Sequence, residues 1–113
     1  MLVALRVERD EKIQSTMKEL ESVLTSFSSS ADDKNNAFEE LKVLNLTIGR
    51  EDELEEMLKK ELGINAFVEI NKNSIKVVVN SKEHNATIAN NIMRSIQKQF
   101  EDKVYITVKF EGK

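Results

Sequence analysis

The segment NAFVEINKNSIKVVVN, residues 65–80, and the segment VYITVKF, residues 104–110, decide the fold of this chain. Apolar residues recur at every second position in these runs, and a period of two is typical of strands with one buried face. Asn71-Lys72-Asn73 separates the first two runs and suits a tight turn, because asparagine tolerates left-handed backbone geometry. The sequence therefore predicts a β-hairpin and a third strand.

An amphipathic helix is expected between the second and third strands. Ile88, Ile92 and Ile96 recur at four-residue spacing, so one helix face is apolar and can cover the sheet. Ser81 is the expected cap of this helix, which is expected to run to about Glu101. The connection favours the spatial order second, first, third for the strands, and the order with the third strand beside the second stays open.

The first half of the chain predicts a series of helices. The first is expected over about residues 2–27, and the Ser30 hydroxyl is the expected cap of the second. At Gly49 the phase of the apolar stripe shifts, which predicts a kink or break and a third helix over about residues 51–62. The expected apolar positions of the first two helices are Ile13, Met17, Leu20, Leu24, Phe27, Ala37, Phe38, Leu41, Leu44 and Ile48.

Together these elements predict an α+β fold in a single domain of residues 1–113. Residues 1–49 provide N-terminal helices. Residues 50–113 provide an α-β-β-α-β module in which the helices pack on one face of a three-stranded sheet. A chain of this length can bury a core without disulfide bonds, and it contains no cysteine.

Composition excludes several classes of function. The formal net charge is −3 and the charges are mixed along the chain, whereas nucleic-acid surfaces need clustered lysine and arginine. No apolar run approaches the roughly 20 residues that cross a bilayer, and the charged residues near the start of the sequence argue against a signal peptide, so none is expected. His84 is the single histidine, so neither a nucleophilic triad nor a zinc site is expected. The sequence predicts no enzyme, no cofactor and no nucleic-acid partner.

The sheet face turned away from the helices is the candidate binding surface. Phe67, Val78 and Tyr105 are expected to point there, with no helix left to cover them. Scattered apolar exposure, which is common, and a partner-binding face with aromatic anchors are both open interpretations. The sheet is also expected to keep two open edges, to which another protein or another copy can add a strand. The candidate partner-binding residues are Phe67, Glu69, Lys76, Val78, Tyr105, Thr107 and Lys109.

Five motifs resemble, in their order and spacing, those of a known family. They are LRVERD at residues 5–10, ELEEML at 53–58, Gly63, AFVEI at 66–70 and SIKVVV at 74–79. Over essentially the whole chain they are similar to the extracytoplasmic domain of the stage III sporulation protein AH family. That family resembles the ring-building modules of secretion-system and flagellar basal-body proteins, with the order helix-strand-strand-helix-strand.

The resemblance implies a structural role in endospore formation. It implies a single-pass protein of the outer forespore membrane, made by the mother cell, with this domain in the intermembrane space. The membrane-spanning helix would precede the present sequence, which is then a soluble fragment. The domain is expected to form a homo-oligomeric ring and to bind stage II sporulation protein Q, a forespore protein with an inactive peptidase-like domain. Together the two would adhere across the space and build a secretion-like channel.

A small nucleic-acid-binding α+β module is the alternative function, because hairpin-helix-strand units also occur among RNA-binding proteins. Such a module would bind RNA with an affinity that falls steeply with salt. Retention of RNA at low salt therefore separates the two hypotheses.

Overall fold

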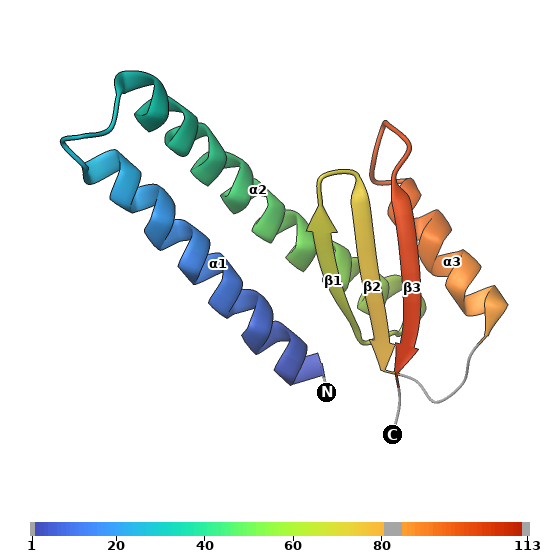
Figure 1. Ribbon diagram of the computed structural model, residues 1–113. Coiled ribbons are helices and arrows are strands. Elements are labelled where there is room, and N and C mark those ends of the chain that lie inside the picture. The colour runs from blue at the N-terminus through green and yellow to red at the C-terminus, as the bar shows by residue number, and fades with distance from the viewer. Residues whose placement is uncertain (1, 81–84, 112–113) are drawn as a thin grey trace. The chain divides into compact units, whose positions relative to one another are not determined.

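A computed structural model describes residues 2–80 and 85–111. Its elements in chain order are α1 (Leu2–Thr25), α2 (Ala31–Leu62), β1 (Ala66–Asn71), β2 (Ser74–Asn80), α3 (Ala86–Gln97) and β3 (Tyr105–Glu111) (Figure 1). The chain is α+β, as the sequence predicts. It divides into two compact units, a helical unit of residues 3–49 and a sheet unit from Arg50 onward. That the two form one domain stays a prediction.

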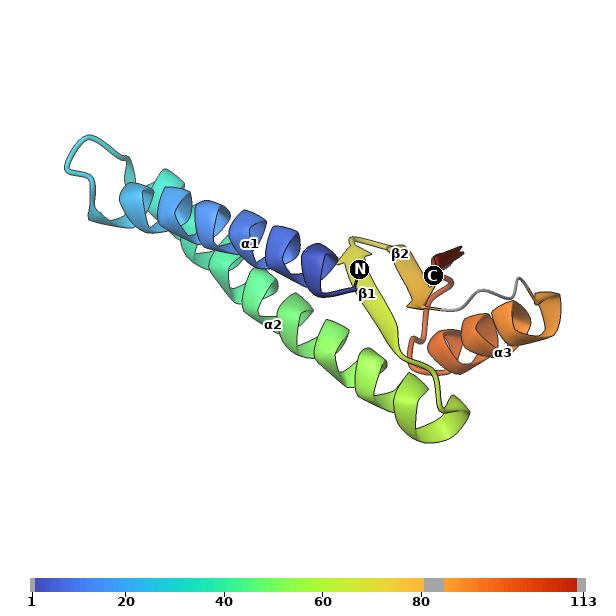
Figure 2. The same cartoon turned by 90° about the horizontal axis from the view of Figure 1, so that it is seen from below.

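The helical unit is a pair of antiparallel helices, α1 and the first half of α2, which lie side by side in both views (Figures 1 and 2). Ser30 Oγ accepts a hydrogen bond from the backbone N–H of Asp33 at 3.1 Å, which confirms Ser30 as the cap of α2. Ile13 and Ala37 are the buried apolar residues of this unit among those described.

Two phenylalanines were expected in the apolar stripes of these helices, and both expectations are wrong. Phe27 is 105% exposed because α1 ends at Thr25 and leaves it in the turn. Phe38 is 59% exposed because it follows the buried Ala37, and adjacent residues of a helix with 3.6 residues per turn point in different directions.

Helix α2 continues through Gly49, so the expected break and the separate third helix are wrong. Glycine inside a helix costs only about 1 kcal/mol relative to alanine. The phase shift of the stripe has another cause. The boundary between the two compact units falls between Gly49 and Arg50, so α2 changes its packing partners there. Beyond the boundary, Leu54 and Leu58 belong to the core of the sheet unit.

The sheet has the order β1-β2-β3, which places β2 in the centre. β1 and β2 are antiparallel across the two-residue turn Lys72-Asn73, as the sequence predicts for a hairpin. β3 runs parallel to β2, with Tyr105 opposite Ser74. The favoured order, with the first strand central, is therefore wrong, and the order that the sequence left open is the observed one.

The apolar run of β2 explains its central place. Val77, Val78 and Val79 are consecutive and are 0%, 1% and 3% exposed. A continuous apolar run, unlike an alternating one, is typical of a strand that is buried on both faces. Such a strand is better placed between two neighbours than at an edge.

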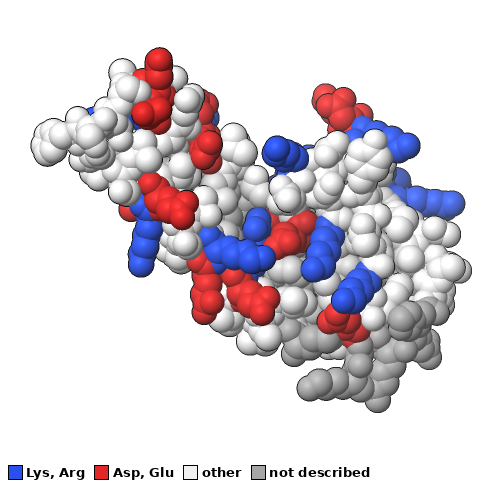
Figure 3. Space-filling view, in the orientation of Figure 1, with Lys and Arg blue, Asp and Glu red and all other residues white. Residues whose placement is uncertain are grey.

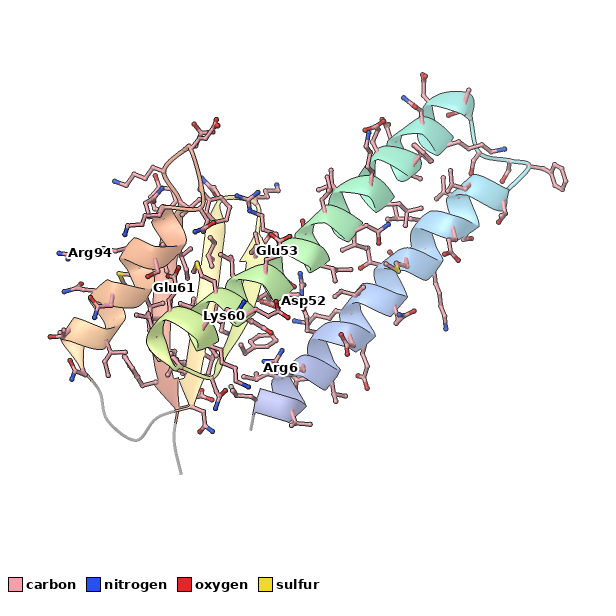
Figure 4. The ribbon with its side chains drawn as sticks, turned by 180° about the vertical axis from the view of Figure 1, so that it is seen from behind. Arg6, Asp52, Glu53, Lys60, Glu61 and Arg94 are labelled. Atoms are coloured by element: carbon pink, nitrogen blue, oxygen red, sulfur yellow. The ribbon has the colours of Figure 1, made fainter. Side chains whose placement is uncertain are left out.

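The core of the sheet unit lies between the sheet and a single layer of helix, which consists of the second half of α2 and of α3 (Figure 2). Leu58, Val77, Ile92 and Ile96 are its fully buried residues, each 0% exposed. This arrangement confirms the expected packing of helices on one face. The outer side of the helix layer is charged, as Figure 4 shows from behind with the exposed Glu53, Lys60, Glu61 and Arg94.

Helix α3 is shorter than expected. Asn85 caps it, because its side-chain oxygen accepts from the backbone N–H groups of Thr87 and Ile88. The helix ends at Gln97 instead of near Glu101. The expected cap, Ser81, lies outside the described residues, as does His84.

Alanine is expected to have opposite effects at Gly49, inside α2, and at Gly63, which follows its last residue. A Cβ at Gly49 meets no atom within 4 Å, so we expect Gly49→Ala to stabilise the protein by about 0.5–1 kcal/mol. Gly63 ends the helix with φ +65°, and we expect Gly63→Ala to destabilise it by about 1 kcal/mol. Urea unfolding followed by circular dichroism measures both. A destabilising Gly49→Ala would contradict the continuous helix.

Candidate partner-binding edge of the sheet

The structure divides the seven predicted partner-binding residues into two groups. Phe67 and Val78 lie opposite one another on β1 and β2 and are 4% and 1% exposed. The expectation that they stand uncovered is therefore wrong. Both sit in uninterrupted apolar runs, residues 66–68 and 77–79, and such runs indicate burial on both faces where the sequence analysis assumed alternation.

The other five residues form a polar surface on the same face of the sheet. Lys76, Tyr105, Thr107 and Lys109 are exposed, and Glu69 is half-buried. The strand register aligns Glu69, Lys76 and Thr107 in one row across the three strands. Lys109 Nζ lies 2.9 Å from Glu111 Oε1 farther along β3. That these five residues contact a partner stays a prediction.

The outer edge of β1 is not open. The backbone N–H of Ile70 donates to Glu51 Oε2 at 2.7 Å, and the backbone N–H of Val68 donates to Glu55 Oε2 at 2.8 Å. Both carboxylates belong to α2 and accept from the side of β1 that faces away from β2. The expectation of two open edges is therefore wrong for β1.

The matching periods of helix and strand make this closure possible. Glu51 and Glu55 are four residues apart, which is about 6 Å along a helix. Val68 and Ile70 are two residues apart, which is about 6.6 Å along a strand. Since outward N–H groups recur at every second residue of an edge strand, carboxylates at i and i+4 of an adjacent helix meet them in step. Hydrogen bonds to a charged acceptor contribute about 1.5–3 kcal/mol each.

The outer edge of β3 has no such cover among the described residues. The N–H of Tyr105 donates to the Asn73 carbonyl at 2.8 Å, so the odd-numbered residues of β3 turn their backbone groups toward β2. The backbone N–H and C=O groups of Ile106 and Val108 consequently point away from the sheet. Their side chains are half-buried against the core. In the described chain, β3 has a neighbouring strand on one side only.

Two side chains fix the loop that leads into β3. Gln97 Nε2 donates to the Asp102 carbonyl at 3.0 Å, and its Oε1 accepts from the Val104 N–H at 3.2 Å. Arg50 Nη2 donates to the Gln99 carbonyl, and its guanidinium lies 4.1 Å from the centre of the Phe100 ring. The start of β3 is thus held by both helices that cover the sheet.

Nothing in the described residues forms a metal centre, since no three histidine or acidic side chains are grouped to hold an ion. No helix in residues 2–80 or 85–111 is long and apolar enough to cross a membrane. The charged side chains of both signs are interspersed on the face shown in Figure 3.

Sequence reasoning missed Glu51 and Glu55 as edge-closing residues. Both lie in an acidic stretch that suited the start of the third helix expected after Gly49. Glu51 is 5% exposed, while its neighbours Asp52 and Glu53 are exposed. The i, i+4 spacing of Glu51 and Glu55 is the signal that could have identified them. Leu54 and Leu58 share this spacing and pack in the core of the sheet unit, so the two glutamates lie near the helix face that contacts the sheet.

Comparison with known proteins gives one family and one similar structure. The profile of the SpoIIIAH-like protein family matches residues 1–108. A solved structure described as the SpoIIQ–SpoIIIAH pore-forming complex contains a chain that is 23% identical, with a TM-score of 0.85. The match covers 98% of this chain and 96% of that one, and at this identity it establishes the fold. No curated protein sequence is significantly similar.

Removal of the buried carboxylate tests the closed edge. We expect Glu51→Ala to lower the free energy of unfolding by about 1–3 kcal/mol, because it leaves the buried N–H of Ile70 without that acceptor. The matched control is Glu53→Ala, an exposed position on the same helix that we expect to change stability by less than about 0.5 kcal/mol. Equal effects of the two substitutions in urea unfolding would contradict a structural role for Glu51.

Proposed function

The chain belongs to the SpoIIIAH-like protein family, and from this premise we propose that it is a structural, non-catalytic component of a sporulation complex that binds a protein of the SpoIIQ type. The fold it shares with a chain of the SpoIIQ–SpoIIIAH pore-forming complex supports this proposal. The finer parts rest on the family resemblance. They are an anchor in the outer forespore membrane, a position in the intermembrane space, and a ring that contributes to a channel and to adhesion.

The open edge of β3 is the observation that carries the binding role. An exposed strand with outward N–H and C=O groups can accept an extended segment of another protein as a further strand. The outward groups of Ile106 and Val108 would supply the backbone hydrogen bonds. Tyr105, Thr107 and Lys109, exposed on the same strand, would contact side chains of the added segment. Tyr105 is the apolar anchor of this set, because Phe67 and Val78 are buried.

The proposed ring requires contacts between copies of this chain, in addition to the contact with the partner. Head-to-tail rings need two different complementary surfaces on every copy. The β1 edge is hydrogen-bonded to Glu51 and Glu55, so within the described residues the sheet offers the β3 edge alone. We therefore assign the copy-to-copy contacts of the proposed ring to surfaces other than the two sheet edges.

No observation favours the alternative of a nucleic-acid-binding module. Phosphate recognition needs a continuous basic surface, whereas the visible face carries interspersed charges of both signs and the chain has a formal net charge of −3.

Proline at an outward position of β3 tests the binding role. The N–H of Val108 points away from β2, so Val108→Pro removes an outward donor without breaking a hydrogen bond of the sheet. In calorimetric titration with a SpoIIQ-type domain, we expect binding to weaken by about tenfold or more, since one lost hydrogen bond and a blocked strand approach together exceed about 1.4 kcal/mol.

Val108→Ala is the matched control, because it removes the same side chain and keeps the N–H. We expect it to bind within a few-fold of the natural sequence, and the far-ultraviolet circular dichroism of both variants should show an intact fold. Equal affinities of the proline and alanine variants would remove the β3 edge as the binding site. Absence of binding by the natural sequence would contradict the proposed function itself.

A further inference from the structure

The open edge of β3 is complementary to itself. An antiparallel copy of β3 can pair with it only in registers that place even-numbered residues opposite even-numbered residues, because Ile106 and Val108 carry the outward groups. One such register centres the two-fold axis on Thr107, so that Ile106 of one copy lies opposite Val108 of the other. In this register each copy presents the same residues to the other, as a two-fold interface requires.

Charged side chains favour this register over the one centred on Ile106. With Thr107 on the axis, Lys103, two residues before β3, falls level with Glu111 of the second copy, and Tyr105 lies opposite Lys109 of the second copy. The first pair joins opposite charges and the second places a cation beside an aromatic ring. A shift that centres the axis on Ile106 would instead place Lys103 opposite Lys109 of the second copy, and like charges across a strand pair repel.

The lysine on β3 does not prevent this pairing. Exposed lysines commonly protect edge strands by repelling a second copy of the same strand. Here Lys109 is offset from Lys109 of the second copy by four residues, roughly 13 Å along the strand. The protection therefore acts against the registers centred on Ile106 and on Lys109, and leaves the one centred on Thr107 permitted.

We propose that, without its partner, the chain forms a two-fold dimer through antiparallel pairing of β3 with β3 of a second copy. The two three-stranded sheets become one continuous sheet with β1 at each end. Glu51 and Glu55 close the outer N–H groups of β1 in both copies, so the assembly ends at two chains and does not grow into a fibre. The same edge cannot hold a second copy and a partner strand at once, so the dimer and the proposed complex exclude one another.

A single cysteine tests this dimer, because the chain contains none of its own. Thr107 would lie opposite itself in a non-hydrogen-bonded pair, with Cα atoms about 4.5 Å apart, within the range of about 4.4–6.8 Å that a disulfide spans. Under mild oxidation we expect Thr107→Cys to give several-fold more disulfide-linked dimer than Lys109→Cys or Lys76→Cys. These controls are also exposed on the same face but would lie far from their counterparts.

Adding Val108→Pro to Thr107→Cys should reduce the yield of linked dimer to that of the controls, since proline removes an outward donor. Circular dichroism verifies that the double variant is folded. Equal cross-linking of Thr107→Cys and Lys109→Cys, or cross-linking that survives the proline, would overturn the dimer and leave the partner as the occupant of the edge. Binding of a SpoIIQ-type domain is measured separately, so loss of the dimer and loss of the proposed function are distinguishable.

Discussion

The two hydrogen bonds from the β1 backbone to Glu51 and Glu55 determine which edge of the sheet is closed. A three-stranded sheet has two edges, and an uncovered edge invites pairing with any other strand. Here α2 lies along β1 and its carboxylates accept the N–H groups of Val68 and Ile70 at 2.8 and 2.7 Å. Burial of Glu51 is tolerable because a charged acceptor bonded to a backbone donor offsets the cost of leaving water. Among residues 2–80 and 85–111, this leaves the β3 edge as the one edge available for association.

The continuity of α2 is what allows this closure. The helix extends from the helical unit into the sheet unit, so Glu51 and Glu55 are presented on a regular helix whose rise matches the strand period. Arg50, the first residue after the boundary, contacts Gln99 and Phe100 in the loop before β3. These contacts hold the start of β3, the strand at the other edge of the sheet. One segment of α2 therefore blocks β1 and helps to position β3. For the proposed assembly role this arrangement is useful, since it would direct a partner to the β3 edge.

Much of the fold could be predicted from the sequence because short-range patterns decide it. The apolar runs of β1 and β2, the alternation in β3, the cap at Ser30 and the stop at Gly63 all depend on neighbours close in the chain. The break predicted at Gly49 was wrong. The apolar stripe of α2 shifts its phase there because the helix changes packing partners, and the helix itself is continuous. Strand order, the burial of Phe67 and Val78, and the roles of Glu51 and Glu55 depend on contacts between distant segments. Of the predicted binding residues, those on β3 are exposed as its local alternation predicts.

Amide hydrogen exchange of individual residues, followed by NMR in dilute protein without a partner, tests the asymmetry of the sheet most directly. The account predicts that the N–H groups of Val68 and Ile70 exchange slowly although β1 is an edge strand, and that those of Ile106 and Val108 exchange rapidly at protein concentrations low enough to keep the chain monomeric. It also predicts that Glu51→Ala accelerates exchange at Ile70 more than at Val77 in the central strand. Rapid exchange at Val68 and Ile70 in the natural sequence, equal to that at Val108, would contradict the claim that α2 closes the β1 edge.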